Sequence, residues 1–191
     1  MIYQDCRFGS DVDSGAPSTA DDQDGRRPRI SVIYTTIEGT LAALDAAVRL
    51  SRGLEAEIIL LVAEELALYY SLDYPPIATA FFEKVCKAIL AELQLDAAPI
   101  RLEIYFCRRQ IKCFESALHP RSVVVLGTGH HFWRRKERKL ASTLKALGHD
   151  ALLVQDATFG PLSKLVVQRI SIDNAKSELG VASHRANRGP A

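Results

Sequence analysis

The sequence lacks any long apolar run, and no stretch approaches the roughly 18 apolar residues that a transmembrane helix needs. It also lacks an excess of one charge: 24 Lys and Arg residues stand against 23 Asp and Glu residues, a formal net charge of +1. A nearly neutral chain argues against a general nucleic-acid binder, because that function needs a basic face. No positive segment followed by an apolar one opens the chain, so we expect no signal peptide, no membrane partner and a cytoplasmic location.

Cysteine is scarce, and its spacing does not suit metal binding. The four cysteines show neither CxxC nor paired metal-ligand spacing, so we expect reduced thiols and no metal site. Common catalytic signatures are missing as well: there is no GxxxxGK[ST], GxSxG or HExxH, and GTGHHF lacks the third glycine of a dinucleotide fingerprint. The sequence therefore predicts no catalytic residue.

Apolar strands alternate with amphipathic helices over residues 29–155. The runs ISVIYT (30–35), EIILLV (57–62) and SVVVLG (122–127) are nearly continuous and rich in β-branched residues, which is typical of strands covered on both faces. The predicted order is β-α-β-α-β-α-β-α-β. This order indicates an α/β fold, a doubly wound open sheet of five parallel strands with helices on both faces.

The two ends of the chain have a different composition. Residues 1–28 are rich in Asp, Ser, Gly, Pro and Arg and are predicted to be a disordered tail. Residues 156–191 are predicted to be a largely irregular extension, in which LSKLVVQRISI suits either a short helix or an extra strand.

Three local patterns resemble the universal stress protein domain over residues 29–155. They are ISVIYTTIEGTLAALDAAVRLSRG followed by AEIILLVAEE, the glycine-ending strand SVVVLGTG, and the final helix and strand ALGHDALLV. The resemblance implies a Rossmann-like domain that forms a homodimer through its last strand and acts in stress response. One subclass of that family binds ATP, and another does not.

The ATP-binding subclass carries Gly-x-x-Gly, then nine residues, then Gly followed by Ser or Thr. Here Gly127 matches the first glycine, but His130 stands at the second. A register that starts at Gly129 instead ends on Ser142 and Thr143. Neither register matches in full, so the resemblance implies a degenerate ATP motif.

Two further positions of the family pattern bear on nucleotide binding. Thr35 stands where the family has a nucleotide-contacting aspartate, and Val62 matches a valine whose backbone lies near the base. The candidate cofactor-binding residues are therefore Thr35, Val62, Gly127, Gly129, Ser142 and Thr143.

A basic run follows the glycine turn. Cations in the first turn of a helix are disfavoured by about 0.3–1 kcal/mol each, so an anion or an acidic partner would offset their repulsion. A solvated basic face is the other interpretation. The candidate contacts to an anion or a partner are His130, Arg134, Arg135 and Lys136.

Three functional hypotheses follow from these patterns. The first is a non-catalytic regulatory module that acts through protein contacts, using residues 134–139 and the long loop 64–77 with its three tyrosines. The second is a stress protein that binds ATP, AMP or another phosphate ligand at a modified glycine turn. The third is a slow ATPase.

Overall fold

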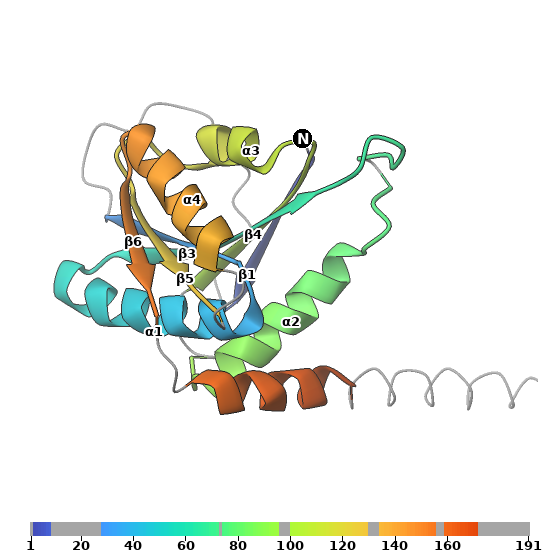
Figure 1. The fold of residues 1–191 in the computed structure, drawn as a ribbon. Helices are drawn as coiled ribbons and strands as arrows, with labels where there is room; N and C mark the ends of the chain where they lie inside the picture. Colours follow the sequence, from blue (N-terminus) through green and yellow to red (C-terminus); the bar gives the residue numbers. More distant parts are fainter. Residues whose placement is uncertain are drawn as a thin grey trace, which may run out of the picture.

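A computed structural model describes residues 2–8, 28–72, 74–95, 100–129, 134–155 and 159–171. Its six strands form one sheet in the order β1-β4-β3-β2-β5-β6 (Figure 1). Five of them are parallel, which confirms the predicted doubly wound α/β fold. These five are β2 (Arg29–Ile33), β3 (Glu57–Glu65), β4 (Ile100–Cys107), β5 (Val123–Gly127) and β6 (Asp150–Val154).

The sixth strand lies in the segment that the sequence analysis assigned to a disordered tail. Strand β1 (Ile2–Phe8) pairs antiparallel with β4, in a register that places Ile2 opposite Phe106 and Phe8 opposite Ile100. The tail prediction is therefore wrong for residues 2–8. A strand that pairs with a partner about a hundred residues away leaves little trace in the local apolar pattern.

Helices cover both faces of the sheet. On one face α1 and α2 pack against the strands, and on the other face α3 and α4 do so. Successive residues of a strand point to opposite faces, which is why Val32 joins one core cluster and Ile33 the other. The helices are α1 (Ile37–Leu54), α2 (Thr79–Glu92), α3 (Gln110–Ala117) and α4 (Arg134–Ala146).

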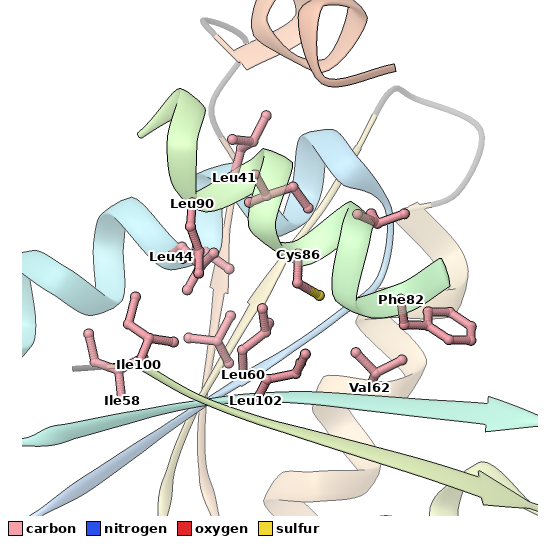
Figure 2. Packing of buried hydrophobic residues seen from close by; sticks show 14 of the residues in the cluster. Leu41, Leu44, Ile58, Leu60, Val62, Phe82, Cys86, Leu90, Ile100 and Leu102 are labelled. Carbon is pink, nitrogen blue, oxygen red and sulfur yellow. The ribbon is translucent and has the colours of Figure 1, made fainter. Parts of the chain in front are cut away.

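The larger core lies under α1 and α2. Figure 2 shows Leu44 of α1 and Leu90 of α2 directed toward Leu60 and Leu102 of the sheet, and Leu41 of α1 belongs to the same cluster. All five of these side chains are at most 1% exposed. The continuous apolar runs of the sequence are thus strands buried on both faces, as expected for a parallel sheet.

A helix over residues 159–171 follows the last strand, and it is one of the two structures that the sequence pattern allowed there. Its Phe159 and Val166 are buried in the same core cluster as α1 and α2. Arg169 forms an ion pair with Glu92 of α2 at 3.0 Å. This helix therefore lies against α1 and α2 on the side that faces away from the sheet (Figure 1).

Candidate functional site

The carboxyl ends of β2 and β5 meet where the strand order reverses. Strand β2 has β3 on one side and β5 on the other, so the chain crosses to opposite faces after these neighbouring strands. Ligands of doubly wound sheets bind in the crevice at this point. The structure places Thr35, Gly127 and Gly129 here, as the sequence analysis expected.

At this crevice the first turn of α1 and the end of β5 touch each other. Thr35 Oγ1 donates a hydrogen bond to the carbonyl oxygen of Gly127 at 2.9 Å. A Cβ atom added to Gly39 would lie 2.6 Å from that same oxygen, and one added to Gly127 would overlap the carbonyl oxygen of Gly39. The first turn of α1 and the end of β5 are in backbone contact, so no space for a phosphate remains between them.

The amino terminus of α1 is occupied by its own capping residue. Thr36 Oγ1 accepts a hydrogen bond from the backbone N–H of Gly39 at 3.0 Å. A Cβ atom on Gly129 would lie 2.8 Å from that hydroxyl oxygen and 3.7 Å from Oε2 of Glu38. A helix amino terminus ordinarily attracts anions, but here a carboxylate and a hydroxyl already lie beside it. The arrangement disfavours a phosphate group.

An open groove of about 500 Å³ borders this turn, between α1 and the helix over residues 159–171. Glu38 and Lys164 contribute one charge of each sign to it. The remaining lining residues are Thr36, Ile37, Ser163, Val167 and Gln168. The groove is thus mixed in charge, and it offers an anion only one cationic side chain.

The remaining candidate residues lie in β3 and α4. Val62 follows Leu61, whose carbonyl oxygen accepts a hydrogen bond from the backbone N–H of Tyr34 at 2.9 Å, so the backbone of Val62 lies beside the end of β2. The side chain of Val62 is buried in the core beneath α2 (Figure 2). Ser142 and Thr143 lie eight and nine residues after the start of α4, about 12 Å along its axis. Thr143 Oγ1 donates to the carbonyl oxygen of Lys139 within the helix. Neither register of the glycine motif therefore places a hydroxyl beside the turn.

The predicted contacts to an anion or a partner lie at the start of α4. Arg135 and Lys136 are exposed in its first turn, whereas His130 and the side chain of Arg134 lie outside the described residues. Glu137 follows them and is buried, with a carboxylate oxygen that has no hydrogen-bond partner among the described residues. A carboxylate near a helix amino terminus is favourable and offsets the basic side chains around it.

A second surface, which we call the aromatic loop surface, projects from the end of β3 (Figure 1). Arg108 holds the first part of the loop between β3 and α2, because its guanidinium donates to the carbonyl oxygens of Ala67 at 2.5 Å and Tyr70 at 2.7 Å. In this loop Leu68 is 87%, Tyr69 80% and Tyr74 84% exposed. The exposed apolar side chains of this surface are Leu68, Tyr69, Tyr70, Tyr74, Ile77 and Phe81.

Titratable groups at the same edge of the sheet have perturbed pKa values. Burial raises the pKa of Glu64. Burial, together with the nearby Cys86 and Glu64, raises the pKa of Tyr34 to about 12. Cys86, Cys107 and Cys113 are buried free thiols, as the sequence analysis predicted. These perturbations follow from packing, and the groups do not form an arrangement of nucleophile, base and orienting residue.

Comparisons with protein-family models, with curated proteins and with solved structures give no significant match to this chain. Among the residues that the structure describes, no cluster of three or more His, Cys, Asp or Glu side chains could hold a metal ion. No helix in the same residues is long and apolar enough to cross a membrane.

Proposed function

We propose that this chain is a non-catalytic regulatory module of the universal stress protein type that acts through protein contacts. The observation that carries the proposal is the aromatic loop surface, in which Leu68, Tyr69 and Tyr74 are almost fully exposed and Arg108 holds the backbone at Ala67 and Tyr70. Tyrosine is enriched at protein interfaces, because a large ring is buried there at low cost in conformational entropy. A loop already held in place loses little further freedom on binding.

The contact between Gly39 and Gly127 supports the non-catalytic part of the proposal. It leaves no room for a phosphate group between the first turn of α1 and the end of β5. Glu38 adds a negative charge beside the same turn. A nucleotide or phosphate ligand remains the second hypothesis.

We further propose that the protein forms a homodimer through β6. This strand is at an edge of the sheet, and its Leu152 and Leu153 are 43% and 39% exposed. Their β5 neighbours, Val125 and Leu126, belong to opposite core clusters, so apolar side chains reach both faces of the edge. A second copy that pairs with β6 would cover both leucines and the free edge of the strand.

Sedimentation velocity tests the dimer. We expect the wild type to sediment as a dimer and Leu153→Lys as a monomer, because a cation at the paired edge would be buried against a second copy. Leu54→Lys is the matched control, since Leu54 is an exposed leucine of α1 on no sheet edge. A monomeric wild type, or a dimeric Leu153→Lys variant, would refute pairing through β6.

Nucleotide binding is tested on the same preparations. We expect no nucleotide to be released from the denatured protein, and no saturable shift of the melting temperature with ATP, AMP or inorganic phosphate. A bound ligand at a hundredfold excess over its Kd would stabilise the fold by about 2.7 kcal/mol, which such a titration detects. A saturable ATP shift would favour the second hypothesis.

Partner binding by the aromatic loop surface is tested with the double variant Tyr69→Ser, Tyr74→Ser. Proteins crosslinked to the wild type in the cell extract are identified by mass spectrometry, and their recovery is compared between variants. We expect the loop variant to lose specific partners that Leu54→Ser retains. Equal recovery with all three proteins would refute the assignment of partner binding to this surface.

A further inference from the structure

Strand β1 is joined to the rest of the fold through one neighbouring strand and a long connection. It pairs with β4, at the end of the sheet. The register places Phe8 in one row across the sheet with Ile100, Ile58 and Ile30. Phe8 is therefore three strand spacings, about 14 Å, from β2. A chain as long as the connecting residues 9–28 reaches about 66 Å when it is extended, so β1 can leave β4 while β2 stays in place.

The register between β1 and β4 sets like charges opposite each other. Asp5 stands opposite Glu103, and Arg7 stands opposite Arg101. Residues directly opposite in an antiparallel pair have Cβ atoms about 4.5–5.5 Å apart, and like charges at such positions destabilise the pairing. Glu103 is only 7% exposed, so salt and water screen its charge weakly. The order of charges in β1 therefore matches this edge of the sheet poorly.

The two charges of β4 are held by their own strand. Arg101 Nε lies 3.1 Å from Glu103 Oε1, and the Tyr105 hydroxyl donates a hydrogen bond to Glu103 Oε2 at 2.9 Å. Residues two apart on a strand share a face of the sheet, which is why these contacts form within β4. A strand that replaced β1 would thus meet an acidic and a basic position in a fixed order.

The alternate residues of β4 form an apolar row. They are at most 2% exposed and belong to the core under α1 and α2: Ile100, Leu102, Ile104 and Phe106. The register sets Gln4 opposite Ile104 and Cys6 opposite Leu102. Glutamine is rarely found in a buried row, whereas valine and isoleucine are favoured in strands. A segment with branched apolar residues at these two positions would therefore suit the edge better than β1 does.

We propose that the β4 edge is a β-addition site, at which an extended segment of a partner protein displaces β1. The partner segment runs antiparallel to β4, with a cation opposite Glu103 and an anion opposite Arg101. Main-chain hydrogen bonds to the edge supply the affinity of such a complex, and the alternating side chains supply its specificity. Without the partner, β1 covers the edge and prevents unselective pairing. The site is separate from the aromatic loop surface and does not rest on it.

Two labelled peptides of identical composition test the charge selection on the full chain. The complementary peptide, Ile-Tyr-Val-Arg-Val-Asp-Phe, sets its arginine opposite Glu103 and its aspartate opposite Arg101 in the register of β1. The control peptide, Ile-Tyr-Val-Asp-Val-Arg-Phe, repeats the charge order of β1. We expect saturable binding by fluorescence anisotropy, at least tenfold tighter for the complementary peptide. The titration extends to about 1 mM, the effective concentration of a strand on a flexible tether.

Hydrogen exchange and one double variant locate the bound peptide. With the complementary peptide at saturation, we expect the amides of residues 2–8 to lose protection while those of β4 keep it, because the peptide takes over the hydrogen bonds of β1. The variant Asp5→Arg, Arg7→Asp makes β1 itself complementary, so it should bind the peptide at least tenfold more weakly. Asp45→Arg, Arg49→Asp is the matched control: it exchanges the charges of an ion pair on α1 and should bind as the wild type does.

Several results would overturn the proposal. Equal affinity for the two peptides would show that the edge accepts any strand, including β1 of a second copy, without charge selection. Binding that leaves residues 2–8 protected would place the peptide elsewhere on the protein. A complementary peptide that does not bind, or that binds the Asp5→Arg, Arg7→Asp variant as tightly as the wild type, would show that β1 is not displaced. The peptide comparison uses the wild type, so it decides the question even where a substitution impairs folding.

Discussion

Replacing Gly127 by alanine tests the backbone contact between the first turn of α1 and the end of β5. The new Cβ atom would overlap the carbonyl oxygen, carbonyl carbon and Cα of Gly39, all of which are backbone atoms in the first turn of α1. No side-chain rotation relieves such an overlap, so α1 must shift relative to β5. Inserting a methyl group into a packed interior costs about 1–3 kcal/mol, and we expect about 3 kcal/mol here because the obstacle is backbone.

Urea unfolding followed by circular dichroism measures this loss. With a slope of about 2 kcal/mol per molar urea, a loss of 3 kcal/mol lowers the midpoint by about 1.5 M. Gly53→Ala is the matched control: nothing lies within 4 Å of its added Cβ, and a helical position gains about 1 kcal/mol from alanine. An unchanged midpoint for Gly127→Ala would show that the crevice is open, and it would remove the steric argument against a nucleotide.

Two other predictions concern the same edge of the sheet. Thr36→Ala should destabilise the fold by about 1 kcal/mol in urea unfolding, because the backbone N–H of Gly39 loses its capping hydroxyl, whereas Thr36→Ser should not. Burial raises the pKa of Tyr34 to about 12, so the folded state holds a proton that the unfolded state loses near pH 10. The resulting stabilisation of about 3 kcal/mol is fully present below pH 10 and is lost as the pH rises to 12. Unfolding free energies from pH 9 to 12 should therefore fall more steeply for the wild type than for Tyr34→Phe, and parallel curves would refute the role of Tyr34.

The sequence predicted the parallel sheet well because its strands are buried on both faces. Residues such as Leu60 and Leu61 point to opposite faces, and both are apolar because helices cover each side. A continuous apolar run therefore indicates a strand of a parallel sheet that helices cover on both faces. The position of the crevice could also be predicted from the sequence, because it depends only on the order of the strands.

The contacts at the crevice could not be predicted from the sequence. Counting residues from Gly127 or Gly129 reaches Ser142 or Thr143, but it does not reveal that α4 already starts at Arg134 and carries both hydroxyls away from the turn. The closeness of Gly39 and Gly127 is a tertiary contact between residues 88 positions apart.

The place of β1 in the sheet has a consequence for synthesis on the ribosome. Strand β1 is made before its partner β4, which follows about a hundred residues later. At translation rates of about 5–20 residues per second, β1 waits roughly 5–20 s before β4 emerges. During that interval the nascent chain holds an unpaired β-segment that other chains could capture, and its docking then closes the exposed side of β4.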